Sequence, residues 1–120
     1  MIYVAVPYSS DDPAVMQHRF NVVTKVSAAL MKRGKMVFSP ITHSHPIAQY
    51  LDAKTALDWK AWQKFDTKML KCCDELYVLM LAGWLDSVGV GAEMQLAREL
   101  GMKITFIDER LKQYAWEDCK

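Results

Sequence analysis

The stretch "ELYVLMLAGWLDSVGVGAEMQLARELGMKITFI", residues 75–107, decides the fold. It begins with one apolar run, "ELYVLML" (75–81), and ends with another, "KITFI" (103–107). Between them, "VGAEMQLAREL" (90–100) has the apolar spacing of a helix. Two strands joined by a helix imply a right-handed crossover and parallel pairing, so the stretch predicts a βαβ unit.

The same alternation runs through the whole chain of 120 residues. Two more apolar runs predict strands, "IYVAV" (2–6) and "MVFSP" (36–40), and three more segments predict helices, at 13–34, 54–73 and 109–117. The strand runs are nearly continuous in apolar residues, as strands covered on both faces are. We therefore predict a single domain over residues 1–120, an α/β three-layer sandwich of flavodoxin-like type with a parallel sheet of about four to five strands.

Composition restricts the partners and the compartment. Fifteen basic residues against 14 acidic ones give a net charge of +1, which offers no basic stripe for a nucleic acid polymer and no polybasic face for a membrane. The first apolar run is too short for a signal peptide or a membrane span. Cys72, Cys73 and Cys119 fit neither a disulfide framework nor a CxxC zinc site. We expect reduced thiols and a cytoplasmic location.

In open parallel sheets, ligands bind outside the carboxyl ends of the strands, near the switch in strand order. The segments expected there are "PYSS" (7–10), "PITHSHP" (40–46), "AGWLDSVGVG" (82–91) and "DER" (108–110). They supply a set of polar and aromatic candidates for substrate binding, namely Tyr8, Ser9, His43, His45, Trp84, Asp86 and Ser87. Trp84 is a candidate to stack on a base.

The two histidines leave three alternatives open. His43 and His45 could contact a substrate, belong to an ordinary polar loop, or bind a metal. Zinc needs a third ligand, and His18 lies far away on a helix, so no metal is expected. Arg19, on the same helix as His18, points either towards the site or into solvent.

Two carboxylates fall on the apolar faces of their helices. At 100° per residue, Asp66 lies between Trp62 and Met69, and Glu93 lies among Leu96, Ala97 and Leu100. An unpaired carboxylate in a core is costly, so such a group is usually paired, protonated or facing a cavity. Either residue alone could be satisfied by backbone groups or Arg19, but the two together predict that both line one pocket.

The two carboxyl groups are also expected to differ in pKa. Glu93 lies in the first turn of its expected helix, where the macrodipole favours the ionised form. Asp66 lies in the middle of a helix among aromatic residues, where desolvation favours the protonated form. Glycoside cleavage requires such a pair, because one group attacks the anomeric carbon and the other protonates the leaving group. This chemistry needs no cofactor.

Small residues precede the helix of Glu93. Gly89 and Gly91 would let a ligand approach the backbone closely, and free N–H groups at a helix start bind anions. Ser87 can cap the helix or donate its hydroxyl to a phosphate. A GxG segment alone is more often a tight turn, so its value here comes from Glu93, which lies two residues beyond Gly91.

The segment "SVGVGAEMQLA" (87–97) resembles the nucleophile motif of the nucleoside 2-deoxyribosyltransferase superfamily. It is especially similar to the branch of 2'-deoxynucleoside 5'-monophosphate N-glycosidases. Asp66 and Asp74, eight residues apart in "FDTKMLKCCDELYVLML", match the superfamily's spacing between a helical aspartate and the aspartate that opens the third strand. Tyr8 in "AVPYSS" matches its tyrosine after the first strand.

The resemblance implies cleavage of the N-glycosidic bond of 2'-deoxynucleosides through a covalent glycosyl-glutamate. Glu93 would be the nucleophile, Asp66 the acid or orienting group, and Tyr8 the residue that holds Glu93 or the sugar hydroxyls. Ser87, with Gly89 and Gly91, would bind a 5'-phosphate. If the adjacent aspartate, Asp86, occupies the serine's position, the substrate would be a nucleoside instead.

Three points stay open after the resemblance is considered. Water would make the protein a hydrolase, and a second base would make it a transferase. The resemblance also implies a homodimer or higher homo-oligomer whose partner completes the site. The alternative function is a non-catalytic nucleotide-binding or nucleotide-sensing protein, which would use the helix start but would not require two carboxylates.

Overall fold

The four apolar runs form strands of one five-stranded sheet in the computed structural model, which describes residues 1–56 and 58–119. The strand order is β2-β1-β3-β4-β5. The bounds are Ile2–Ala5 for β1, Val37–Phe38 for β2, Glu75–Leu79 for β3, Lys103–Ile107 for β4 and Gln113–Tyr114 for β5. The first four strands are parallel, as predicted, and β5 is antiparallel to β4.

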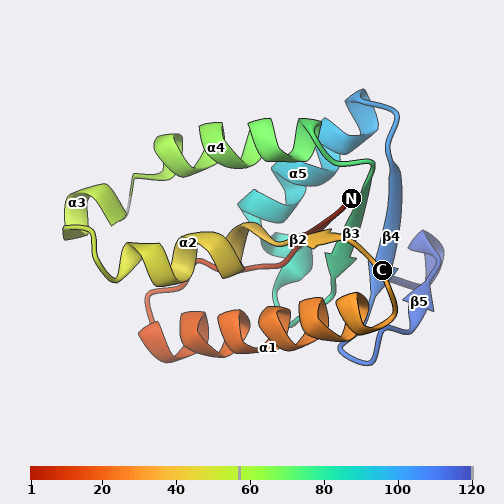
Figure 1. Ribbon diagram of the computed structural model, residues 1–120, viewed down its shortest axis with the longest axis horizontal. Helices are drawn as coiled ribbons and strands as arrows, with labels where there is room; N and C mark the ends of the chain where they lie inside the picture. Colours follow the sequence, from red (N-terminus) through yellow and green to blue (C-terminus); the bar gives the residue numbers. More distant parts are fainter. Residues whose placement is uncertain (57, 120) are drawn as a thin grey trace.

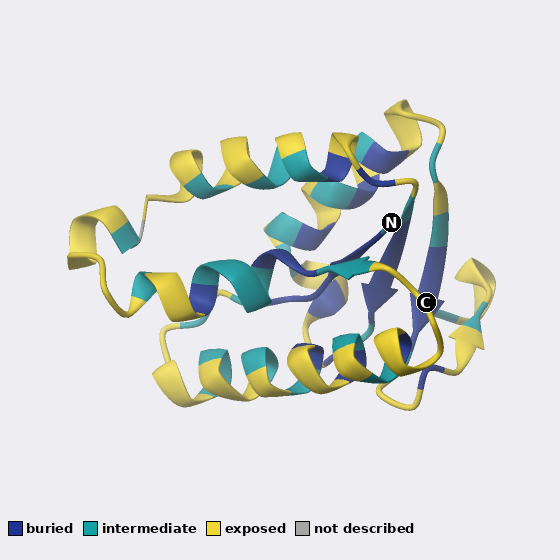
Figure 2. Ribbon diagram, in the orientation of Figure 1, coloured by how far each residue is buried: buried dark blue, intermediate teal, exposed yellow. Residues whose placement is uncertain are grey.

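Helices cover both faces of the sheet, and the alternation of side chains along β1 explains why (Figure 1). Ile2 and Val4 face α1 (Pro13–Lys32), with a core that includes Val23, Val26 and Leu30 of that helix. Tyr3 and Ala5 face the opposite layer, formed by α4 (Trp59–Lys71) and α5 (Val88–Glu99). Figure 2 shows the sheet largely buried and the outer helix faces exposed.

The caps at the helix starts match the sequence signals. The Asp12 side chain accepts a hydrogen bond from Ala14 N at 2.9 Å, and Pro13 opens α1. The Ser87 side chain accepts from Val90 N at 3.2 Å and caps α5. Helix α5 therefore starts two residues earlier than predicted, and both glycines lie inside it.

Helix α2 (Pro40–Ala48) was not predicted, because its residues were expected to form a strand end and a loop. Strand β2 has only two residues, and Ser39 then lies at the N-cap position. Pro40 follows at the first helical position, where its fixed φ favours a helix. The histidines of this segment consequently lie on a helix, and their side chains are separated by its turn.

The predicted helix 54–73 is divided into α3 (Ala53–Ala56) and α4. Asp58 starts α4, since its side chain accepts from Ala61 N at 3.2 Å. Position 57, inside the predicted helix, lies outside the described residues, as does position 120.

The predicted helix 109–117 is wrong. Asp108 Oδ1 accepts from the backbone N–H groups of Arg110 and Lys112, which makes a turn after β4. Leu111 in that turn has a positive φ of 68°. The chain returns as β5 and ends in η2, a 3₁₀ helix at Trp116–Cys119. None of the described helices is long and apolar enough to cross a membrane.

Candidate functional site

Asp66 on α4 and Glu93 on α5 lie close enough to interact, with Tyr3 of β1 beside them on the same face of the sheet. Burial is the main cause that raises the pKa values of Glu93 and Tyr3; the charge of Asp66 adds to the rise for Glu93, and the charges of both carboxylates add to the rise for Tyr3. Among the described residues, Tyr3 Oη, Asp66 Oδ1 and Glu93 Oε2 are buried without a hydrogen-bond partner. Native cores rarely leave such atoms unpaired, so three of them in one interacting group make this cluster the candidate site. Both carboxyl groups therefore face the same layer of the protein, while the prediction that they line one pocket stays a prediction.

The expected order of the two pKa values is wrong. Burial raises the pKa of Glu93 to about 8, although interaction with the Tyr3 hydroxyl lowers it in part. Burial raises the pKa of Asp66 to about 6. Because α5 begins at Val88, Glu93 lies in its second turn, where the macrodipole is weaker. Its carboxyl group is also more deeply buried than that of half-buried Asp66, so desolvation decides the order.

The start of α5, the helix that carries Glu93, has unused hydrogen-bond donors. Gly91 N donates to Ser87 O at 3.0 Å, and Val90 N donates to the Ser87 side chain. Helix geometry leaves the N–H groups of Val88 and Gly89 without an intrahelical acceptor. The Ser87 hydroxyl accepts in this cap, so its own hydrogen is available to a ligand. These donors and the positive end of the helix dipole suit an anion.

The two glycines of α5 have different surroundings. Neither has a positive φ, so the backbone conformation does not require glycine at either position. A Cβ at Gly89 would lie 3.6 Å from the Trp59 ring, an ordinary contact distance. A Cβ at Gly91 would have no atom within 4 Å. Trp59 therefore packs over Gly89, and the open approach to the helix is at Gly91.

Tyr8 does not contact the carboxyl pair. Its hydroxyl lies 2.6 Å from Nδ1 of His45, whose Nε2 lies 3.1 Å from Oε1 of Gln17 on α1. The side-chain oxygen of Gln17 can only accept a hydrogen bond, so Nε2 of His45 carries the ring proton and donates it. Nδ1 of His45 then accepts a hydrogen bond from the Tyr8 hydroxyl. Phe20 stacks on the imidazole with ring centroids 4.3 Å apart. The residue that interacts with Glu93 is instead Tyr3, which sequence reasoning missed.

One signal in the sequence could have identified Tyr3. It is the only residue of the run "IYVAV" with a polar side-chain atom, and this run is buried on both faces. A phenol hydroxyl in that setting needs a polar neighbour. The alternation along the strand then assigns that neighbour to the helices that carry Asp66 and Glu93.

The two histidines of α2 point to different layers of the molecule. His45 is buried against α1, whereas His43 stacks on Phe65 of α4, with centroids 4.7 Å apart and the rings 10° from parallel. Phe38 connects this stack to Tyr3, at 5.7 Å between centroids. His43 thus lies on the side of the carboxyl pair and His45 does not. The described residues contain no group of three His, Cys, Asp or Glu that could hold a metal.

Arg19 points neither into solvent nor at the carboxyl pair. Its guanidinium donates to the carbonyl oxygens of Tyr8 at 3.3 Å, Ser9 at 3.1 Å and Ala82 at 3.1 Å. These carbonyls belong to the loops that follow β1 and β3, the neighbouring strands where the strand order reverses. Arg19 therefore fixes the two loops against each other, and Ser9 contributes its backbone to this contact.

Trp84 and Asp86 lie in η1 (Trp84–Asp86), the turn before Ser87. Trp84 is buried against Phe106 and Trp116, with ring centroids at 5.6 and 6.3 Å. It is a core residue, so its indole is not free to stack on a base. Asp86 is exposed and Ser87 is partly buried, so both are accessible at the loop.

Two surface hollows lie elsewhere on the protein, and neither includes Asp66 or Glu93. One, of about 260 Å³, lies between α1 and the end of β3 and is lined by Val15, His18, Arg19, Met80, Leu81, Ala82 and Glu109. The other, of about 460 Å³, lies along the outer face of α4. Gly91, at the start of α5, borders open space.

The family model described as "Domain of unknown function (DUF1937)" matches residues 1–109, which is most of the chain. The chain belongs to this family. The match spans β1 to β4 and so includes Tyr3, Asp66, Ser87 and Glu93, while β5 and η2 lie beyond it. No curated protein matches the chain.

Proposed function

We propose that this protein cleaves the N-glycosidic bond of 2'-deoxynucleosides, preferentially as their 5'-monophosphates, through a glycosyl-glutamate intermediate. The single observation that carries the proposal is the cluster of Tyr3, Asp66 and Glu93, whose buried oxygens lack partners in one interacting group. Retaining glycosidases use two such carboxyl groups on opposite sides of the bond that breaks. The resemblance of residues 87–97 to the deoxyribosyltransferase motif supports the same assignment.

In the first step, the Glu93 carboxylate attacks C1' and the electrons of the C1'–N bond pass to the base. Asp66 gives its proton to a nitrogen of the base as the bond breaks. In the second step, Asp66 as carboxylate takes a proton from water, and the water oxygen attacks C1'. The C1'–Glu93 bond then breaks, which releases the sugar and restores both side chains. A second base in place of water would make the reaction a transfer.

The pKa values determine which form of the pair is reactive. Between about pH 6 and pH 8 the pair holds one proton, and the order of the pKa values keeps most of it on Glu93. Attack needs the minor arrangement with the proton on Asp66. Because the pKa of Glu93 is the higher of the two, this arrangement is the less populated one. Tyr3 raises its population, because the Tyr3 hydroxyl favours ionised Glu93.

The start of α5 supports a 5'-phosphate. The Ser87 hydroxyl and the free N–H groups of Val88 and Gly89 form a set of donors. Trp59 packs over Gly89, so the open approach to these donors is from the side of Gly91. Exposed Asp86 lies next to this set and would disfavour a phosphate placed on its side. The proposal therefore assigns the phosphate to Ser87 and leaves Asp86 as the residue that would select an unphosphorylated sugar.

We also propose a flavodoxin-like fold and a homo-oligomer. The order β2-β1-β3-β4-β5 supports the first, with antiparallel β5 as a departure from that type. Two apolar side chains near the start of α5 support the second, since Leu85 and Val88 are 56% and 77% exposed. A partner that covered them would shield the carboxyl pair from water. Sedimentation velocity would measure the oligomeric state.

The second candidate is a nucleotide-binding protein without catalysis. The protonated state of Glu93 at neutral pH favours it, because an un-ionised carboxyl group is a poor nucleophile but a good hydrogen-bond donor. Such a protein would bind nucleotides at the start of α5 and release them unchanged.

The test is incubation with 2'-deoxynucleosides, their 5'-monophosphates and the matching ribonucleotides, with free base measured by chromatography. We expect base release from deoxynucleotides, faster from the 5'-monophosphates. Saturable binding with no base release from any compound would favour the binding protein and overturn the enzymatic proposal.

A further inference from the structure

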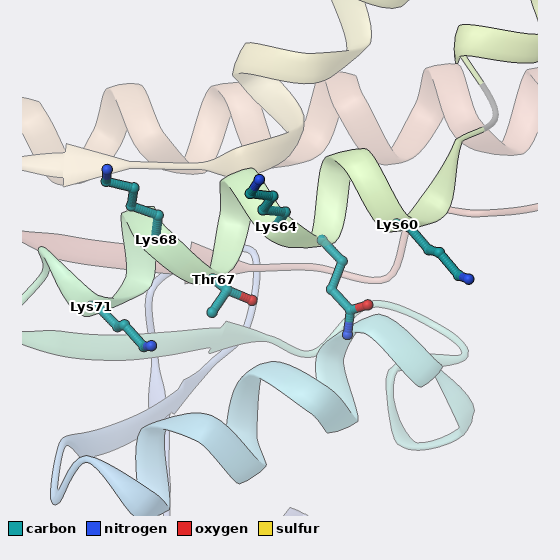
Figure 3. Close-up of a pocket in the computed structure, with 6 residues that line it drawn as sticks. Lys60, Lys64, Thr67, Lys68 and Lys71 are labelled. Carbon is teal, nitrogen blue, oxygen red and sulfur yellow. The ribbon is translucent and has the colours of Figure 1, made fainter.

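The outward side of α4 carries four lysines along its length. Lys60, Lys64, Lys68 and Lys71, with Gln63 and Thr67, line an open hollow of about 460 Å³. Figure 3 shows these side chains leaving a single helix, with the lysines spread from one end of it to the other. We refer to these six residues as the lysine face. All four lysines are exposed.

The charge of the lysine face is not neutralised within the described residues. None of its lysines forms an ion pair with a described Asp or Glu, and the one acidic residue of α4, Asp66, points to the other side of the helix. The net charge of +1 thus conceals an uneven distribution, with four lysines against one aspartate in 13 residues. Local concentration of one sign attracts a partner of the other sign.

The lysines have a regular linear spacing. Successive positions at 60, 64 and 68 rise by about 6 Å along the helix axis, and the last step is about 4.5 Å. A row of point charges at such intervals suits a chain of anionic groups better than a single small anion. Gln63 and Thr67 add uncharged hydrogen-bonding groups between the lysines.

Two aromatic side chains flank the lysine face. Trp59 is 47% exposed and Phe65 is 38% exposed, and a helix wheel puts them at opposite margins of the lysines. One side of the Trp59 ring lies against Gly89 and one face of the Phe65 ring stacks on His43, so each ring offers its remaining exposed surface. Proteins that bind single strands combine a cationic track for the backbone with aromatic side chains on which bases stack. We propose that the lysine face, with Trp59 and Phe65, binds single-stranded nucleic acid.

Other polyanions fit this surface less well. A duplex keeps its bases stacked inside, so the two aromatic residues would have no role in binding it. A membrane-surface helix buries its apolar face in the lipid, but the apolar face of α4 packs on the sheet, with Leu70 buried there. The net charge of +1 predicted no basic stripe for a nucleic acid polymer, but the local concentration of lysines on α4 supplies one. The four lysines and Asp66 lie on different sides of α4, so the lysine variants test the inference separately from the proposed catalysis.

The experiment measures binding of a fluorescently labelled 12-nucleotide oligothymidylate by fluorescence anisotropy between 50 and 200 mM salt. If four lysines contact phosphates, the slope of log K against log salt is about −2.8, and affinity falls about 50-fold over this range. The double variant Lys64→Gln, Lys68→Gln should halve the slope, so that affinity falls only about 7-fold. Trp59→Leu should weaken binding without a change in slope.

A matched control separates the lysine face from net charge. The double variant Lys25→Gln, Lys35→Gln removes the same charge from exposed positions on and after α1, and it should leave the slope unchanged. Circular dichroism establishes that each variant is folded. Absence of binding at 50 mM salt, an equal loss in the control variant, or equally tight binding of a 12-base-pair duplex would overturn the inference. Equal binding to vesicles of phosphatidylserine and phosphatidylcholine would also overturn it.

Discussion

Burial raises the pKa of Glu93 on α5, and the nearby charge of Asp66 on α4 raises it further, so ionisation of one carboxyl group affects the other. They belong to helices separated in sequence by β3 and its following loop, and both helices pack on the face of the sheet that contains Tyr3. The interaction has consequences for rate, pH dependence and stability, and each can be measured.

The pH dependence of base release tests the pairing of the two carboxyl groups. We expect a bell-shaped profile of kcat/KM with limbs near pH 6 and pH 8, because one proton on the pair is required. In Asp66→Asn the charge that raises the pKa of Glu93 is lost. The variant should lose the alkaline limb and keep a single rising limb with a midpoint below pH 8. An unchanged bell in Asp66→Asn would show that the limbs belong to other groups.

Tyr3→Phe tests the role of the phenol hydroxyl. That hydroxyl lowers the pKa of Glu93, so its removal should move the rising limb measured in the Asp66→Asn background towards higher pH. Stability at pH 5 should change by less than about 1 kcal/mol, because the buried Tyr3 Oη makes no hydrogen bond among the described residues. Tyr8→Phe is the matched control, since Tyr8 bonds to His45 and should not move the limb. Equal shifts in the two variants would contradict the assignment.

Stability should depend on pH through Glu93. A carboxyl group whose pKa is raised by folding binds its proton more tightly in the native state, so stability falls as pH rises from the unfolded pKa, near 4.5, towards the folded value of about 8. The loss for Glu93 is on the order of 3 kcal/mol between pH 5 and pH 7.5. Urea denaturation should detect this loss in the wild type and a much smaller one in Glu93→Gln. Exposed Glu99, on the same helix, provides the control Glu99→Gln, which should behave as the wild type.

Gly91→Ala separates stability from ligand approach. Helical residues without a positive φ gain about 0.5–1 kcal/mol from Gly to Ala, and a Cβ here meets no atom within 4 Å. The free energy of unfolding should therefore increase. If the substrate lies against this backbone, kcat/KM should decrease at the same time. A more stable variant with full activity would exclude Gly91 from the site.

Ser87→Gly tests the phosphate assignment without a large loss of the helix cap. Glycine costs only a few tenths of a kcal/mol at this position, whereas alanine costs about 1 kcal/mol. The variant should raise KM for the 5'-monophosphate and leave KM for the nucleoside unchanged. Asp86→Asn should have the smaller effect on the monophosphate. The opposite pattern would assign substrate choice to Asp86.

Local patterns were sufficient for much of the fold and for the carboxyl pair. The apolar runs predicted the four parallel strands, and the helix wheels predicted that Asp66 and Glu93 face inward, because periodicity alone determines these features. Helix α2 was missed because Pro40 can end a strand or begin a helix, and only the two-residue length of β2 decides between them. The turn at Asp108 was missed because its hydrogen bonds depend on side-chain orientation.

Site details that depend on depth could not be predicted. The order of the two pKa values follows from how deeply each carboxyl group is buried, and a helix wheel gives direction but no depth. The burial of Trp84 depends on Trp116 and Phe106, which lie beyond it in sequence. The pairing of Tyr8 with His45 depends on helix α2, which had not been predicted.

The most direct measurement is the rate of base release from a 2'-deoxynucleoside 5'-monophosphate by the wild type, Glu93→Gln and Glu99→Gln at equal concentrations of folded protein. Loss of the nucleophile in Glu93→Gln should reduce the rate by at least about 10³-fold. Removal of the nucleophile from an enzyme that also forms a covalent intermediate, in acyl transfer, lowers kcat by more than this factor. The wild type and Glu99→Gln should release base at the same rate. Release by Glu93→Gln at the wild-type rate would contradict the assignment of Glu93 as the nucleophile.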